Sequence, residues 1–153
     1  MKYIKIKKKK IGLGLKPFLI AEVGINHNGN LKRAFKMIEV AKEAGVDAVK
    51  FQTFKADEFI SNKKKIYTYF SKGKKINESM YRMFKRNELS NSSWLKIKKK
   101  CEKEKIIFLS TPQNYSDLQL LIKIGIPAVK VGSDDFNNIP LIKKYLKYKL
   151  PLI

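Results

Sequence analysis

Charged and hydroxyl side chains stand where the apolar segments of this sequence end. One apolar run finishes in Glu22, the next in Lys50, and a later one in Lys130. A charge inside an apolar strand is costly unless something pairs with it, so chance placement at every strand end is improbable. The candidate site residues that this pattern gives are Glu22, Lys50, Gln52, Thr53, Ser110, Thr111, Lys130 and Ser133.

Two lysines, several hydroxyls and a carboxylate could together form a binding site for a small anion. Lysine supplies a compact positive charge, while hydroxyls and the backbone N–H groups near Gly132 supply hydrogen bonds to phosphate or carboxylate oxygens. The carboxyl ends of parallel strands are where α/β folds hold ligands. The alternative is a buried ion pair between Glu22 and one lysine, which leaves the second lysine and the hydroxyls unexplained.

The other reactive residues have simpler interpretations. His27 is the only histidine and is interpreted as a loop residue, because one histidine is too few for a metal site. Cys101 is the only cysteine and cannot form an internal disulfide, so we interpret it as an ordinary helix residue. Asp134 and Asp135 could cap a helix, contact a metal or act as a general base, and their spacing favours the cap.

Brief apolar runs alternate with segments of helical period from residue 18 onward. Strands that are apolar on both faces and separated by helices predict an α/β fold with a buried parallel sheet, either doubly wound or closed into a barrel. The predicted strands are 18–23, 46–52, 106–110 and 127–131, with a fifth beginning at Leu150, and the predicted helices are 31–44, 93–105, 115–124 and 139–148.

Local signals mark the helix ends and two further segments. Asn30 can accept hydrogen bonds from the free N–H groups of the first helix, and Gly45 suits the left-handed residue that ends it. Residues 2–10 alternate with a strand-like period and predict a short hairpin. Residues 54–89 form a long polar and aromatic stretch, which after a strand's carboxyl end predicts a functional loop.

The net charge of +21 raises the question of a polyanion partner. Only three of the 34 basic residues are arginines, whereas specific base reading and bidentate phosphate contacts favour arginine. We therefore expect a solvated basic surface and no specific nucleic-acid partner. No apolar run is long enough for a membrane helix and no secretory signal is evident, so we expect no membrane partner and a cytoplasmic location.

Four motifs resemble, in order and spacing, the N-terminal barrel half of the N-acetylneuraminate (sialic acid) synthase family, which includes legionaminic and pseudaminic acid synthases. They are IAEVGINHNGNL, AKEAGVDAVKFQTFKA, FLSTP and IPAVKVGSDDFNNIPLI. The segment IKIKKKKIGLGLKP also resembles the hairpin that precedes the first barrel strand in that family. Four motifs in register are far more specific than any one of them alone.

The resemblance implies a (β/α)₈ barrel with its site at the carboxyl ends of the strands. Residues 1–17 would form the hairpin, and residues 18–153 about the first four and a half βα units. The implied reaction is attack of the phosphoenolpyruvate methylene carbon on the aldehyde of an N-acetylated sugar such as N-acetylmannosamine, followed by water addition and phosphate loss.

The resemblance also implies roles for the candidate residues. Lys50 and Lys130 would hold the phosphate and carboxylate of phosphoenolpyruvate. Thr111 and Ser133 would add hydrogen bonds. Glu22 and Gln52 would face the sugar.

The chain departs from the family pattern in two places. Where the family usually has Gly-Ser-Gly-Glu, this sequence has Gly-Ser-Asp-Asp, so Asp135 would be the catalytic carboxylate and is one methylene shorter. A complete barrel takes about 250 residues. In the family, two histidines of the second half hold a divalent metal, usually manganese, and an antifreeze-like domain completes the site across a homodimer. We expect this chain to bind no metal alone and to be an incomplete, inactive fragment.

Two other functions fit parts of the pattern. A basic polyanion-binding module would explain the charge but not Glu22, Lys50 and Lys130 at strand ends. Another phosphoenolpyruvate-dependent synthase on the same barrel, such as a 3-deoxy-sugar acid synthase, would also use an anion site. The GINHNG and KFQTFKA motifs favour the sialic acid branch.

Overall fold

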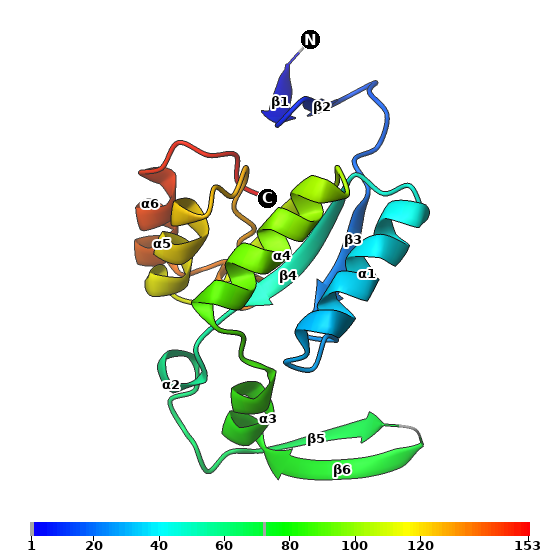
Figure 1. The fold of residues 1–153 in the computed structure, drawn as a ribbon. Coiled ribbons are helices and arrows are strands. Elements are labelled where there is room, and N and C mark those ends of the chain that lie inside the picture. The colour runs from blue at the N-terminus through cyan, green and yellow to red at the C-terminus, as the bar shows by residue number, and fades with distance from the viewer. Residues whose placement is uncertain (1, 72) are drawn as a thin grey trace.

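Three parallel strands form the sheet that positions the polar residues. In the computed structural model, which describes residues 2–71 and 73–153, the sheet has the order β3-β4-β7 (Figure 1). The strands are β3 (Ile20–Gly24), β4 (Ala48–Thr53) and β7 (Ile107–Pro112). Their register places Glu22 opposite Lys50 and Gln52 opposite Thr111, so these polar residues meet near the carboxyl ends.

Helices cover one face of this sheet. Figure 1 shows α1 and α4 in front of the strands, with α5 and α6 to one side. The main core joins Val49 and Phe51 of β4 to Ile38 of α1 and Trp94 of α4. The helices are α1 (Leu31–Glu43), α4 (Asn91–Lys103), α5 (Tyr115–Lys123) and α6 (Ile139–Leu146).

The helix ends follow the local chemistry that the sequence predicted. The Asn30 side chain accepts a hydrogen bond from the Arg33 N–H at 3.0 Å, which confirms the predicted cap of α1. Gly45 follows the end of α1 with a φ of +75°, a left-handed conformation that glycine adopts at no steric cost. Cys101 is a buried residue of α4, as expected, and burial raises the pKa of its thiol to about 12.

A short hairpin covers the amino ends of the strands on the other face of the sheet. The strands β1 (Tyr3–Ile6) and β2 (Lys9–Gly12) pair antiparallel. Ile6 is fully buried against Ala48, Leu109 and Ala128. The inner face is therefore apolar at the amino ends of the strands and polar at the carboxyl ends.

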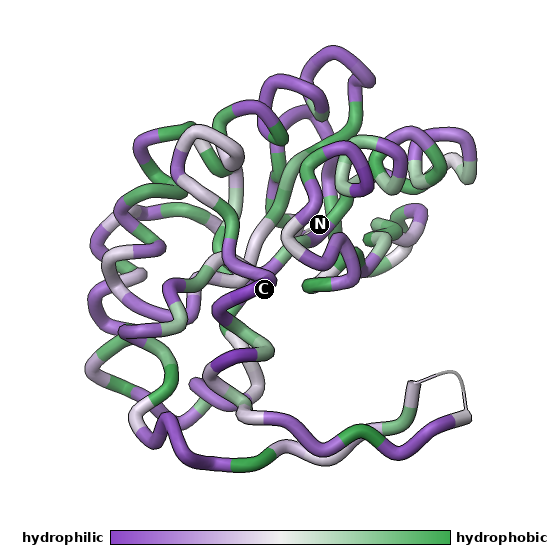
Figure 2. The backbone as a smooth tube through the Cα atoms, turned by 60° about the horizontal axis from the view of Figure 1, so that its bottom comes forward, coloured by the Kyte–Doolittle hydropathy of each residue, from purple (hydrophilic) through white to green (hydrophobic). Residues whose placement is uncertain are grey.

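Residues 54–89 have regular structure, so the prediction of a long loop is wrong for most of this segment. The stretch contains α2 (Ala56–Phe59), β5 (Ile66–Ser71), β6 (Lys74–Ser79) and α3 (Met80–Asn87). The rings of Phe54, Phe59 and Phe84 pack together, with centroids 5.0–6.3 Å apart. These aromatic contacts anchor α2 and α3, and Figure 2 shows the β5–β6 arm extending away from the sheet.

The fourth predicted strand is shorter than expected. Residues 127–131 contain one parallel bridge, between Val129 and Leu152, rather than a full strand. Pro127 has no N–H to donate, and only the Val129 and Val131 N–H groups bond to residues 151–153. The α/β class and the parallel sheet are confirmed, while closure into a (β/α)₈ barrel stays a prediction. Within the described residues, no helix has the length and apolarity needed to cross a membrane.

The buried end of the hairpin generates a stability prediction. Ile6→Ala removes a fully buried side chain and should lower the free energy of unfolding by about 2–5 kcal/mol. Ile4→Ala is the matched control, because Ile4 lies on the same strand and is 47% exposed, and it should change stability by less than about 0.5 kcal/mol. Urea denaturation measures both, and equal losses would contradict the packing described for Ile6.

Candidate anion-binding site

Lys50 is a nearly buried cation in the middle of the sheet. Its side chain is 8% exposed, and its ammonium group lies 2.9 Å from the Glu22 carboxylate, whose side chain is 59% exposed. The ammonium also donates to the Thr111 hydroxyl at 3.3 Å. An ammonium group has three N–H donors, so these two partners leave one donor for a further acceptor.

Thr111 links Lys50 to the segment that carries the second lysine. A Cβ atom placed on Gly132 would lie 3.6 Å from the Thr111 methyl group and would overlap the Asp134 carboxylate. Gly132 therefore lies within van der Waals range of β7, while its tight contact is with Asp134 of the same turn. Lys130 and Ser133 line a cavity of about 570 Å³ at this point, and the Lys130 ammonium donates to the Val131 carbonyl. Lys130 thus lies two residues before Gly132, the neighbour of Thr111, but neither Lys50 nor Thr111 lines this cavity.

The remaining predicted site residues divide between the two faces of the sheet. Gln52 follows Lys50 by two residues, so it lies on the same face and is half-buried. Thr53 and Ser110 point to the helix-covered face, because they alternate with Gln52 and Thr111 along their strands. Their hydroxyls are buried and hydrogen-bond each other at 2.7 Å. The structure does not bring these two hydroxyls to the Lys50 ammonium.

Asp134 and Asp135 lie in a 3₁₀ turn, η1 (Ser133–Asp135), and neither caps α6. The cap is Asn138, whose side chain accepts from the Leu141 N–H, so the interpretation of the acidic pair as a helix cap is wrong. Asp135 accepts a hydrogen bond from the Asn138 side chain at 3.0 Å. Asp134 instead lies against Gly132, beside Thr111.

His27 is a loop residue, as predicted, but it is completely buried. Its Nδ1 atom accepts from the Gly29 N–H at 3.1 Å, so the neutral ring carries its proton on Nε2. The ring packs edge-on to Trp94 and tilted against Phe51, the neighbour of Lys50. Burial lowers the pKa of His27 to about 4. His27 thus holds the loop after Glu22 against the core.

Sequence reasoning missed two buried polar residues near these strand ends, Asn87 and Gln113. Within the described part of the chain, the Asn87 Oδ1 and Gln113 Oε1 atoms have no hydrogen-bond partner, as is also true of His27 Nε2. Gln113 directly follows β7, a position that could have signalled its proximity. Asn87 ends α3 inside the segment predicted as a loop, so no strand-end signal pointed to it.

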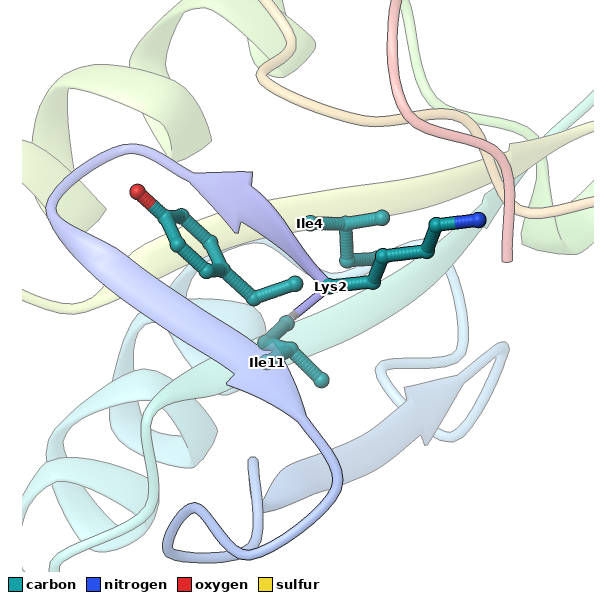
Figure 3. Close-up of a pocket in the computed structure, with 4 residues that line it drawn as sticks. Lys2, Ile4 and Ile11 are labelled. Atoms are coloured by element: carbon teal, nitrogen blue, oxygen red, sulfur yellow. The ribbon is translucent and has the colours of Figure 1, made fainter.

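Another pocket lies at the opposite end of the sheet. Figure 3 shows Lys2, Ile4 and Ile11 lining it on the N-terminal hairpin. Because the hairpin covers the amino ends of the strands, this pocket is remote from Lys50 and is not part of the candidate site.

The residues of the site do not fit a divalent metal. Residues 2–71 and 73–153 contain no group of three or more His, Cys, Asp and Glu side chains placed to hold one. The single histidine is buried with one nitrogen bonded to Gly29. No chemical step is therefore assigned to a metal here.

Several known proteins are similar to this chain in sequence and in fold. A sequence model of the NeuB family matches residues 37–153. The chain is 38% identical over 138 residues to the N,N'-diacetyllegionaminic acid synthase of Campylobacter jejuni, covering 90% of this chain and 41% of that protein. It is 34% identical over 140 residues to the N-acetylneuraminate-9-phosphate synthase of Homo sapiens, covering 89% of this chain and 38% of that protein.

A solved structure agrees with these sequence matches. The N-acetylneuraminic acid (sialic acid) synthetase of Leptospira borgpetersenii, in complex with citrate, superposes with a TM-score of 0.84 at 30% identity. The match covers 99% of this chain and 48% of that chain. The chain thus spans about 40% of the length of these curated relatives and about half of the solved synthetase.

The buried imidazole generates a pH prediction. In the unfolded chain His27 is protonated below about pH 6.5, whereas in the folded chain it stays neutral down to about pH 4. The contribution of His27 to stability is therefore present above pH 6.5 and is lost as the pH falls towards 4, by about 3 kcal/mol in total.

Denaturation of wild type and His27→Gln from pH 7 to pH 4 measures this contribution. Burial also raises the pKa of Asp117 to about 7, which makes the free energy of unfolding change with pH in the opposite direction. This contribution is the same in both proteins, so the difference between them isolates His27. The wild type should lose more stability than the variant over this range. Parallel curves for the two proteins would show that the imidazole is not held neutral by burial.

Proposed function

Because this chain belongs to the NeuB family, we propose that it provides the phosphoenolpyruvate-binding part of a synthase that condenses phosphoenolpyruvate with an N-acetylated amino-sugar. The family assignment confirms the resemblance found in the sequence motifs. The product would be a nonulosonic acid, with phosphate as the second product. The complete condensation is proposed for a polypeptide that contains these residues, since the chain spans about 40% of its curated relatives.

The observation that carries this proposal is the nearly buried ammonium of Lys50 between Glu22 and Thr111. Burying a cation is unfavourable unless its hydrogen-bonding capacity is used, and here one partner is an exposed carboxylate that a ligand can replace or join. A dianionic phosphate would supply stronger charge-assisted hydrogen bonds than Glu22 alone. A purely structural ion pair would leave the second lysine, Lys130, unexplained.

The proposed roles follow the positions of the side chains. Lys50 and Lys130 would hold the phosphate and carboxylate of phosphoenolpyruvate, with hydrogen bonds from Thr111 and Ser133. A carbon–carbon bond then forms between the phosphoenolpyruvate methylene carbon and the sugar aldehyde carbon. The aldehyde oxygen takes up a proton as this bond forms. Water adds to the former enol carbon and loses a proton, and the bond between that carbon and the phosphate ester oxygen then breaks, which leaves a ketone and releases phosphate.

Carboxylates would serve the proton transfers and orient the sugar. Glu22 is the exposed partner of Lys50, so we propose it as the carboxylate that faces the sugar together with Gln52. Asp135 is the proposed equivalent of the family glutamate. Its hydrogen bond to Asn138 would orient it, while Asp134 lies closer to Gly132.

The names of the relatives suggest the class of sugar. Two of them are named for the synthesis of N,N'-diacetyllegionaminic acid or N-acetylneuraminate-9-phosphate. We propose N-acetylmannosamine or a related N-acylated sugar as the substrate. A cytoplasmic location, a homodimer and a manganese requirement stay predictions from the family resemblance.

Phosphoenolpyruvate binding to the 153-residue chain tests the proposal directly. Isothermal titration should show binding that Lys50→Met and Lys130→Met each weaken at least about tenfold, the effect of losing roughly 1.4 kcal/mol of a charge-assisted contact. Lys50→Met should leave the free energy of unfolding within about 1 kcal/mol of the wild type, because an apolar side chain suits a buried position.

Lys123→Met is the matched control, because Lys123 is exposed in the last turn of α5 at the far end of the strands. It removes the same charge and should leave the affinity unchanged. If all three variants weaken binding equally, the chain is a general polyanion binder and the proposal fails.

The expectation that the isolated chain does not complete the reaction has its own test. The purified chain is incubated with manganese, phosphoenolpyruvate and N-acetylmannosamine while phosphate release is followed. We expect no release above the rate without sugar. Sustained release that depends on the sugar would overturn the expectation.

A further inference from the structure

A small cavity lies between the turn of the N-terminal hairpin and the end of α4, beside the start of β7. It measures about 130 Å³, and Figure 1 shows the hairpin and the end of α4 at the same end of the sheet. Phe108, which lines it, packs in the helix-covered core, whereas Lys50 lies on the opposite face of the sheet. The cavity is therefore separate from the candidate anion-binding site. Its charged lining residues are Lys7, Lys98, Glu102 and Lys105.

Lys98 is a nearly buried cation in the wall of this cavity. Its side chain is 7% exposed, although the neighbouring lysines of α4, Lys96 and Lys99, are exposed. Its ammonium group has three N–H donors, and the Glu102 carboxylate is its one hydrogen-bond partner among residues 2–71 and 73–153. A buried cation is unfavourable unless its donors are used, so a further acceptor in the cavity would stabilise Lys98.

Glu102 leaves room for such an acceptor. Its side chain is 62% exposed, so the carboxylate can stay hydrated when a ligand takes its place beside Lys98. The hydrogen bond from Lys98 lowers the pKa of Glu102 from its ordinary value, and the charges of Lys98, Lys7 and Lys99 lower it further, although burial opposes them. The positive charge of Lys7 on the hairpin therefore reaches the Glu102 carboxylate.

The cavity carries a surplus of positive charge. Three lysines line it against one carboxylate, which leaves two positive charges without a partner of opposite sign in its wall. The last carbonyl groups of α4 would repel an anion, but they are occupied. The Lys105 N–H donates to the Glu102 carbonyl at 3.1 Å, and the Ile106 N–H donates to the Cys101 carbonyl at 3.0 Å. A dianion with several acceptor oxygens would balance this surplus.

The size of the cavity limits which anion it can hold. Sites for drug-sized molecules measure about 300–1,000 Å³, so a cavity of about 130 Å³ suits a small ion and excludes a sugar ring or a nucleotide. A phosphate group carries about two negative charges at neutral pH and several strong acceptor oxygens.

From these features we propose that the cavity lined by Lys7, Lys98 and Lys105 binds a free phosphate ion. It is a second anion site, remote from Lys50, and it does not depend on the proposed function.

Inorganic phosphate titrated into the ¹⁵N-labelled chain tests the proposal, because backbone amide NMR reports where the ion binds. The amide signals of residues 101–106 should shift saturably in the wild type and equally in Lys50→Met. Shifts that are confined to the surroundings of Lys50 and vanish in Lys50→Met would overturn the proposal, since phosphate would then bind only at the candidate anion-binding site.

Matched variants of the lysines locate the contact. Lys98→Met should weaken phosphate binding at least about tenfold, and Lys105→Met at least about threefold. Lys103→Met is the control, because Lys103 is an exposed lysine of the same helix end that does not line the cavity, and it should leave the affinity unchanged. Urea denaturation checks that each variant folds. Equal losses in all three variants would overturn the proposal, as would unchanged affinity in Lys105→Met.

A variant of the carboxylate separates a ligand site from a structural ion pair. Glu102→Gln removes the group that competes for Lys98, so it should strengthen phosphate binding at least about threefold. Glu43→Gln, an exposed residue of α1 that does not line the cavity, removes the same charge and should have no effect. Unchanged affinity in Glu102→Gln would show that Lys98 and Glu102 form only a structural pair.

Phosphoenolpyruvate distinguishes the free ion from the phosphate group of a larger molecule. Because its carboxylate and methylene groups need additional space, it should shift the signals of residues 101–106 with an affinity at least about tenfold weaker than that of inorganic phosphate. Equal affinities of the two ligands at these residues would contradict a site built for the free ion.

Discussion

A positive charge buried in a parallel sheet must be stabilised from neighbouring strands, and Lys50 imposes this requirement on the fold. Its partners are Glu22 from one side of β4 and Thr111 from the other. Both contacts depend on the parallel register of three strands, because a shift of one residue would turn each side chain to the opposite face. The helices stabilise the sheet in this register by covering its other face.

The inner face of the sheet is apolar at one end of the strands and polar at the other. Ile6 and Leu109 fill the inner face at the amino ends, and the polar side chains gather at the carboxyl ends. Two further segments carry polar groups to those ends, the loop with His27 and the arm between β4 and α4. Within the described residues, the Asn87 Oδ1 atom is buried without a hydrogen-bond partner, which is unusual for a buried acceptor.

The sequence predicted local features well and long-range ones less well. Asn30 and Gly45 predicted the two ends of α1. The polar residues at the strand ends predicted that Lys50 lies near Glu22 and Thr111. Both signals depend on residues that are close in the sequence. The failures depend on tertiary contacts. Nothing local shows that three phenylalanine rings order residues 54–89, or that the ring of His27 enters the core between Phe51 and Trp94. Strand alternation would have separated Thr53 and Ser110 from the site, had it been applied to them.

The central claim is that the ammonium groups of Lys50 and Lys130 are reserved for one anionic ligand among many solvated lysines. NMR of the lysine side-chain ¹⁵Nζ groups measures this directly while phosphoenolpyruvate is added. The account predicts that the Lys50 and Lys130 signals change saturably and together, and that the remaining lysines change little. Small, unsaturable changes spread over all the lysines would contradict it, because they would show that the chain offers the ligand only a diffuse basic surface.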